Sequence, residues 1–404
     1  MIVGLVENMF NNMPQNHMIF KWRCPKWICV ALIFFQINFS PDHTVAQINY
    51  IWDMPPWAPI PIVPEDNPMS GVKVDLGRHL FYEKRLSISQ SMSCGSCHKQ
   101  ENAFADGRRK ALGVTGESHS RNTPTLTNVA YSPILTWADP NTISLEDHLL
   151  TPLFSENPVE MGMKGQRNKI VEMLANERDY RLSFQAAFPE SRIKVSITNI
   201  AKALAAFQRT LISFSSPYDH YRFNGEPNAI SSSAKRGERL FFSEPLNCFR
   251  CHQAPFFTDS YKHLGLPFEE IAFHNTGLYN LSGNGSYPEP NTGLHKHTGN
   301  MEDMGRFRTP SLRNVSLTAP YMHDESIDSL EGVLEFYSMG GRQIFDGALA
   351  GNGTRNPFKS SFVMGFPLSS KDKIDLIEFL KSLTDNSFVQ NLHYGEPGLA
   401  SATP

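Results

Sequence analysis

The sequence has almost no net charge. Its 404 residues include 37 basic and 40 acidic side chains, for a formal net charge of -3, so we expect no strong attraction to nucleic acid or to an anionic membrane. Charged residues are sparse as well, at 19%, against 40% hydrophobic residues. This balance excludes a disordered or fibrous chain and leaves enough apolar side chains for sizeable cores. The length favours two or three domains.

The N-terminal segment lacks an apolar run long enough to cross a membrane. Residues 27–39 are mostly apolar, but a spanning helix needs about 20 residues. Three basic residues precede this stretch and small residues follow it: Lys21, Arg23 and Lys26, then Thr44, Val45 and Ala46. Such an order is typical of a cleaved secretory signal. We predict that residues 1–46 leave on export, so that the protein is periplasmic or at the cell surface, without a stable membrane span. A retained anchor is the alternative.

Cysteine is scarce, and its placement is informative. Two of the six cysteines, Cys24 and Cys29, lie in the export segment. The other four form two copies of the CxxCH motif: Cys94, Cys97 and His98, then Cys248, Cys251 and His252. In this motif the thiols bond covalently to haem and the histidine coordinates the iron. A zinc site would not need the adjacent histidine, and a redox dithiol is not expected twice. We therefore predict two covalently bound haem c groups.

The surroundings of the two motifs are duplicated. Gly77 to Phe81 precedes the first motif as Gly237 to Phe241 precedes the second. Three more pairs follow in the same order: Phe104 to Asp106 with Phe257 to Asp259, Thr123 to Val129 with Thr309 to Val315, and Ser144 to Glu146 with Ser329 to Glu331. Repetition of four anchors indicates a duplicated domain. We predict one haem in each of two domains, residues 47–225 and 226–404, with the boundary near residues 217–233.

Secondary structure is predicted to be helical wherever a pattern is clear. Apolar residues recur at helical spacing from Ile197 to Leu211. Ser369 is a candidate N-cap for a second helix with Ile374, Ile377, Leu380 and Leu383 facing inward. Residues 170–188 are a third candidate, and long Gly/Pro/Asn stretches separate the helices. The predicted fold class is mainly α, with two cytochrome c-like domains.

With both haem motifs in place, the sequence resembles the bacterial dihaem cytochrome c peroxidase and MauG superfamily. The resemblance is carried by Leu76 to Phe81, Asn157 to Gly162 and Pro310 to Asp324. Three further segments look most like the MbnH branch, which is associated with copper-handling proteins: Tyr50 to Pro55, Phe273 to Tyr279 and Phe379 to Asp385. The resemblance implies two cytochrome c-like domains with one calcium ion between them.

The resemblance also implies roles around the first haem, which is similar to the family's peroxide-reacting haem. Glu160 stands where the family has the acid/base that moves a proton during cleavage of hydrogen peroxide. His119 lies on a loop where some peroxidases carry a distal ligand, although its spacing matches that ligand poorly. His148 stands where Gln is more usual, which makes the hydrogen bonding near this iron different from the family pattern.

Other implied roles lie between the haems. Trp137 is the only tryptophan between the two motifs and corresponds to the family's inter-haem tryptophan. The alternative is that Trp137 is a buried aromatic residue with a packing role only. The family's calcium ligands, an Asn side chain and two backbone carbonyls, map to Asn122, Thr318 and Pro320. Oxygen-only ligation suits calcium.

The duplication offers an independent hint about iron ligation. Ungapped alignment of the Ser-Leu-Glu anchors sets Tyr337 of the second copy opposite Pro152 of the first. Proline has no ligating atom, whereas a tyrosine oxygen can bind ferric iron. We predict that Tyr337 ligates the second iron, as in the MauG type, and that the first iron is open. Met339, two residues further on, keeps His/Met ligation as an alternative.

The resemblance to this superfamily implies a peroxide-dependent enzyme. Hydrogen peroxide would drive both haems to a high-valent state that oxidises a residue, expected to be a tryptophan converted to kynurenine, on a partner such as a copper-binding protein. The alternative is a cytochrome c peroxidase that takes electrons from a small cytochrome c or cupredoxin. A dihaem electron carrier, in which Glu160 has no catalytic role, is a third possibility.

Overall fold

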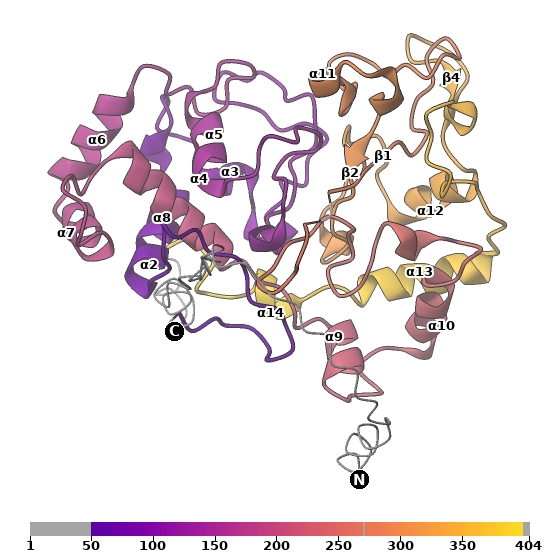
Figure 1. The fold of residues 1–404 in the computed structure, drawn as a ribbon, viewed down its shortest axis with the longest axis horizontal. Helices are drawn as coiled ribbons and strands as arrows, with labels where there is room; N and C mark the ends of the chain where they lie inside the picture. The colour runs from indigo at the N-terminus through magenta and orange to yellow at the C-terminus, as the bar shows by residue number, and fades with distance from the viewer. Residues whose placement is uncertain (1–49, 270, 399–404) are drawn as a thin grey trace, which may run out of the picture. The chain divides into compact units, whose positions relative to one another are not determined.

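The computed structural model describes residues 50–269 and 271–398 (Figure 1). The predicted signal peptide, residues 1–46, lies outside the described residues, together with Cys24 and Cys29. Within the described ranges, helices are too short or too polar to cross a membrane.

Two helix pairs form the frame of the molecule. Helix α2 (Gly71–Phe81) packs on α8 (Ile197–Arg209), and α10 (Ser232–Phe241) packs on α13 (Ser370–Lys381). Each of these four helices begins after a serine whose side chain accepts a hydrogen bond from a backbone N–H of the first turn, which satisfies one of the donors left free at a helix start. The duplicated sequence therefore gives two equivalent helix pairs.

A glycine makes each helix crossing possible. A Cβ atom on Gly77 would lie 1.9 Å from the Ala203 carbonyl oxygen, and one on Gly237 would lie 1.9 Å from the Asp375 carbonyl oxygen. Both distances are far inside van der Waals contact, so only glycine permits this approach of the backbones. The glycine of the duplicated Gly-x-x-Leu-Phe anchor is thus a packing requirement of each half.

Shorter elements complete the chain, and the mainly helical fold class is confirmed. The remaining α-helices are α3 (Cys94–Cys97), α4 (Leu145–His148), α5 (Leu150–Phe154), α6 (Arg167–Asn176), α7 (Arg178–Ala187), α9 (Pro217–Phe223), α11 (His295–Thr298), α12 (Leu330–Ser338) and α14 (Asn386–Val389). The 3-10 turns are η1 (Lys84–Leu86), η2 (Gln100–Asn102), η3 (Val129–Tyr131), η4 (Cys248–Arg250), η5 (Met301–Asp303), η6 (Val315–Leu317) and η7 (Gly353–Arg355). Two antiparallel strand pairs are described: β1 (Phe273–His274) with β2 (Phe307–Arg308), and β3 (Gln343–Ile344) with β4 (Gly351–Asn352).

Two details of the predicted helices are wrong. The candidate over residues 170–188 is two helices, α6 and α7, because Glu177 has an extended backbone between them. Ile374 was expected to face inward but is 59% exposed. Its neighbour Asp375 takes the buried side of α13, where Arg236 forms a 2.6 Å ion pair with it. The predictions for Ile377, Leu380 and Leu383, which are buried, and for the Ser369 cap are confirmed.

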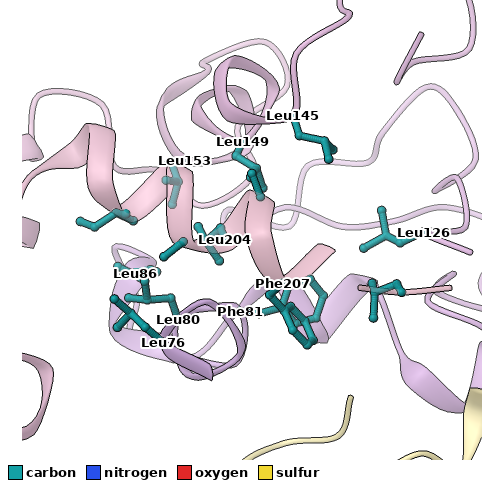
Figure 2. Close-up of a cluster of buried hydrophobic side chains, with 14 of the residues drawn as sticks. Leu76, Leu80, Phe81, Leu86, Leu126, Leu145, Leu149, Leu153, Leu204 and Phe207 are labelled. Atoms are coloured by element: carbon teal, nitrogen blue, oxygen red, sulfur yellow. The ribbon is translucent and has the colours of Figure 1, made fainter. Parts of the chain in front are cut away.

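Each half has its own apolar core. The first core lies between α2 and α8 and includes Leu76, Leu204 and Phe207, as Figure 2 shows. The second lies around α10 and α13 and includes Phe241 and Phe379.

The C-terminal end of the chain joins the first core. Phe388 of α14 packs against Phe104, with ring centroids 5.6 Å apart, and Tyr394 packs against Phe388. The division into domains at residues 225/226 stays a prediction. Helix α14 belongs to the predicted second domain but packs against the core of the first half.

Candidate haem sites

The first CxxCH motif begins as a single helical turn. Cys94 and Cys97 bound α3, and burial raises the pKa of the Cys94 thiol to about 12 and that of Cys97 to about 11. The Nδ1 atom of His98, which follows directly, lies 2.8 Å from the Phe104 carbonyl oxygen. A Nδ1–H donor to this carbonyl fixes the tautomer and leaves Nε2 free as an iron ligand.

The second motif repeats this geometry. Cys248 opens the 3-10 turn η4, and Cys251 directly follows the turn. The Nδ1 atom of His252 lies 2.9 Å from the Phe257 carbonyl oxygen. Phe104 and Phe257 are equivalent anchors, and both have a positive φ, 62° and 54°. The same backbone turn therefore orients the histidine of the CxxCH motif in each half.

A cavity of about 250 Å³ lies beside the second motif. Cys248, Cys251 and His252 line it, and most of its remaining wall is apolar, including Leu312, Val333, Leu334, Phe366, Leu376 and Leu380. Two thiols, an oriented histidine and an apolar cavity together are the surroundings that a covalently attached haem requires. The residues present fit the predicted group.

Tyr337 faces this cavity, whereas Met339 does not line it. Burial raises the pKa of the Tyr337 hydroxyl, and the side chain lines the cavity with His252. Met339 is 60% exposed. Of the two candidate ligands, Tyr337 is the one that lies with the haem motif.

Glu160 is half-buried in a loop near the first motif. The Glu160 carbonyl accepts a hydrogen bond from the Val114 N–H at 2.8 Å, and Met161 N–H donates to the Pro152 carbonyl at 2.9 Å. Burial raises the pKa of the Glu160 carboxyl to about 7. Its charge is a smaller cause of the raised pKa of both thiols, after burial and Cys97 for Cys94, and after burial and Asp106 for Cys97. A carboxyl with this pKa can both accept and donate a proton near neutral pH.

Two histidines were also expected near the first haem. His148 ends α4, and burial, followed by the nearby charge of His98, lowers its pKa to about 4, so it is neutral at physiological pH. His119 lies on the loop that holds Val114, where its N–H donates to the Ala111 carbonyl at 2.9 Å. Burial lowers the pKa of His119 as well. Its ligation of the first iron stays a hypothesis.

Trp137 is held by both halves of the molecule. Its indole Nε1–H donates to the Asn122 carbonyl at 2.8 Å. Its own carbonyl accepts a 2.8 Å hydrogen bond from the Arg308 N–H. Asn122 and Arg308 each directly precede the Thr-Pro anchor of their half, and Trp137 lines the second cavity. These contacts fix the indole at the edge of the second haem site.

The predicted calcium ligands lie together. Asn122, Thr318 and Pro320 all line the second cavity. The Asn122 Nδ2 atom donates to the Pro320 carbonyl at 2.7 Å and to the Met322 carbonyl at 3.2 Å. If the Asn122 amide turned over, its Oδ1 atom would point toward the same carbonyl oxygens. These oxygens together would form the oxygen-only donor set that calcium prefers. The residues therefore fit a calcium ion.

Sequence reasoning missed three polar residues at the second site. The Nε2 atom of His274 lies 2.6 Å from Asp259 Oδ2, and both approach the Cys251 sulfur. Burial opposes protonation of His274, but the hydrogen bond to Asp259 raises its pKa to about 10. Arg308 is buried beside them. Asp259 and Arg308 belong to or adjoin duplicated anchors, so the alignment with Asp106 and Asn122 was the signal that could have found them.

Comparisons with known proteins agree with this geometry. Residues 72–228 match the family model of di-haem cytochrome c peroxidase. The chain is 35% identical to cytochrome-c peroxidase IdrP1 of Pseudomonas sp. strain SCT, over 90% of this chain and 93% of that protein. It is 33% identical to the methylamine utilization protein MauG of Methylophilus methylotrophus, over 79% and 84%.

A solved structure is also similar. The crystal structure of a MauG-like protein associated with microbial copper homeostasis has a TM-score of 0.84 and 44% identity, covering 86% of this chain and 99% of that one. Fold, haem motifs and relatives give one conclusion: the chain belongs to the di-haem cytochrome c peroxidase and MauG family of oxidoreductases.

Proposed function

We propose that this enzyme uses hydrogen peroxide to oxidise a tryptophan on a partner protein, converting it to kynurenine. The observation that carries the proposal is Tyr337, which lines the second haem cavity while Met339 faces solvent. Tyrosine stabilises oxidised iron better than methionine does, which suits an enzyme that stores oxidising equivalents. The similar MauG-like protein associated with copper homeostasis supports a copper-binding partner.

The haems, when bound, supply the redox chemistry, and the chain supplies proton transfer and positioning. Glu160 takes a proton from one peroxide oxygen and returns it to the leaving oxygen, because its pKa of about 7 allows both directions. Trp137, fixed by two hydrogen bonds, relays electrons between the two sites. In the overall reaction, two molecules of peroxide become water while the indole of the partner gains two oxygen atoms; hydrolysis then releases formate and leaves kynurenine.

Calcium and location complete the proposal. The Asn122 side chain and the carbonyls of Thr318 and Pro320 would bind one calcium ion. The ion would thereby fix Asn122, whose backbone carbonyl accepts the indole N–H of Trp137. The N-terminal signal would place the enzyme in the periplasm or at the cell surface.

The second candidate is a cytochrome c peroxidase that reduces peroxide to water with electrons from a small cytochrome c or cupredoxin. A specific observation favours it: the relative with 35% identity over most of the chain is a cytochrome-c peroxidase. In this reading Trp137 would carry electrons toward the first haem instead of oxidising equivalents away from it.

A peroxide titration of the fully oxidised holoprotein separates the two functions. Stoichiometric peroxide without a reductant is expected to change the visible and near-infrared spectra of both haems for minutes. A protein that stays unchanged until one haem is reduced, and that then oxidises reduced cytochrome c continuously, would establish the peroxidase instead. Mass spectrometry of a copper-binding protein added after the peroxide reports tryptophan oxidation, and the Glu160→Gln variant is the control for uncatalysed oxidation.

A further inference from the structure

Arg308 is a buried cation without a carboxylate partner. Its side chain is only 9% exposed, and it lines the second haem cavity with His252 and Tyr337. Its guanidinium donates only to two backbone carbonyls, those of Thr136 at 3.2 Å and Thr309 at 3.4 Å. Within residues 50–269 and 271–398, no carboxylate lies within ion-pair distance of Arg308.

Such a charge needs a counter-ion. Burying an unpaired guanidinium is unfavourable, because the charge loses its hydration, and a carboxylate at hydrogen-bond distance offsets this loss. Asp259, whose charge acts on Arg308, is hydrogen-bonded to His274 at 2.6 Å instead. Asp259 Oδ1 has no hydrogen-bond partner among the described residues, but no ion pair joins it to Arg308. A carboxylate on the molecule that fills the cavity would supply the missing ion pair.

A second unpartnered polar atom faces the same cavity. His323 is 5% exposed, lines the cavity, and has no hydrogen-bond partner for its Nε2 among the described residues. Its ring stacks on Phe307, the residue before Arg308, with centroids 3.7 Å apart. The wall next to Trp137 thus presents two polar groups in a cavity that is otherwise largely apolar.

We propose that Arg308 binds a propionate carboxylate of the second haem and couples that haem to Trp137. The guanidinium would form the ion pair, while the Arg308 N–H already holds the Trp137 carbonyl at 2.8 Å. One residue then links the cofactor edge to the proposed relay. This inference rests on the haem at the second motif and not on the choice between the two functions.

The first half offers a built-in contrast. The position equivalent to Arg308 is Asn122, which is directed at the carbonyls of Pro320 and Met322. At this position the two copies have diverged: one holds a predicted calcium ligand and the other holds the proposed cation for the haem. Only the second haem should respond to loss of the arginine.

Redox titration of the oxidised holoprotein tests the inference without peroxide or a partner, so its failure is separate from failure of the proposed function. Arg308→Gln is expected to shift the oxidised-to-reduced ratio of the second haem about tenfold toward oxidised at a fixed potential, or about 59 mV for one electron. The first haem should keep its potential. The propionate bending band in the resonance Raman spectrum should also move.

Two further variants make the result decisive. Arg308→Lys keeps the charge and should retain most of the native potential. Arg306→Gln removes a cation two residues away that is paired with Asp303 at 3.4 Å, and it should change neither haem. Unchanged potentials and an unchanged Raman band in Arg308→Gln would overturn the inference. If Arg308→Gln loses the second haem, retention of haem by Arg308→Lys supports the ion pair, and loss from both variants refutes it.

Discussion

The two halves share the same helix pairs but differ in the helix that follows the repeated Ser-Leu-Glu anchor. Ser144 caps α4 and Ser329 caps α12 in the same way, with the serine oxygen accepting the N–H three residues later. In the second half α12 continues unbroken over Leu330–Ser338 and carries Tyr337 into the haem cavity. In the first half the helix breaks at Leu149, and the aligned position is Pro152 of α5.

This difference shows how one duplicated fold makes unequal sites. The Pro152 carbonyl accepts the Met161 N–H, so the broken helix anchors the loop that carries Glu160 instead of providing a ligand. One half gains a titratable carboxyl near its haem motif, and the other gains a tyrosine. The proposed division into a peroxide-reacting haem and a ligated haem follows from this single structural change.

The largest expected effect comes from removing the carboxyl that only the first half has. Glu160→Gln should slow the reaction with peroxide by about 10² to 10⁴-fold, because general acid–base catalysis contributes that much. Stopped-flow absorbance under single-turnover conditions measures it. Glu156→Gln, an exposed carboxylate paired with Lys164 in the same loop, is the matched control and should react normally. Native kinetics in Glu160→Gln would remove this residue from the mechanism.

The same reaction should depend on pH through Glu160. Burial raises its pKa from 4.5 to about 7, and only the ionised carboxylate can accept the peroxide proton. The rate should therefore rise with pH with a midpoint near 7 and level off above it. The glutamine variant should lose this dependence; a midpoint that persists in the variant would assign the titration to another group.

Removing the tyrosine of the second half should change the other haem alone. Tyr337→Phe deletes the candidate ligand oxygen, so low-temperature EPR should show an altered second haem and an unaltered first haem, with both still attached. Tyr337→Met is expected to abolish partner oxidation. Met339→Leu serves as the control because Met339 is exposed. A changed spectrum in Met339→Leu with a normal Tyr337→Phe would reverse the ligand assignment.

A buried ion pair between Arg313 of the second half and Asp219 of α9 has no counterpart at the aligned position of the first half. Arg313 is fully buried and binds Asp219 through both Nη atoms, at 2.8 and 2.9 Å, whereas the aligned residue of the first half is Thr127. Arg313→Met should lower the free energy of unfolding by about 3–5 kcal/mol, because it leaves the Asp219 charge buried and unpaired. Adding Asp219→Asn should restore part of the loss in chemical denaturation. Additive losses would contradict this origin.

The smallest effects on stability should come from substituting the glycine at each helix crossing, where the two halves are most alike. Gly77→Ala and Gly237→Ala should each cost about 1–3 kcal/mol, since the added methyl group meets a backbone oxygen at 1.9 Å. Gly71→Ala, in the same helix as Gly77 but with no atom within 4 Å of the new methyl group, should be neutral or slightly stabilising. Thermal unfolding measures all three. A clear difference between Gly77→Ala and Gly237→Ala would show that the two crossings are not equivalent.

Local patterns predicted much of this fold and site. Caps and spacing located α8 and α13, and the two CxxCH motifs located the haem sites. Periodicity failed where a long-range contact decided burial: Asp375 is buried because Arg236 of another helix pairs with it, which turns Ile374 outward. The return of Phe388 to Phe104 is likewise beyond a pattern that looks only at neighbours in the chain.

Local patterns in the chain were enough to predict two haem motifs, the duplication and the helical class, because covalent motifs and helix spacing depend only on near neighbours. That the repeated glycines Gly77 and Gly237 lie at helix crossings was visible only in the structure. The tertiary structure decided which polar groups meet at the second cavity. Arg308, His274 and Asp259 come together from separate segments. Their charges interact strongly only because burial excludes the water that would otherwise screen them. The unequal chemistry of the two halves is therefore a property of packing around equal motifs.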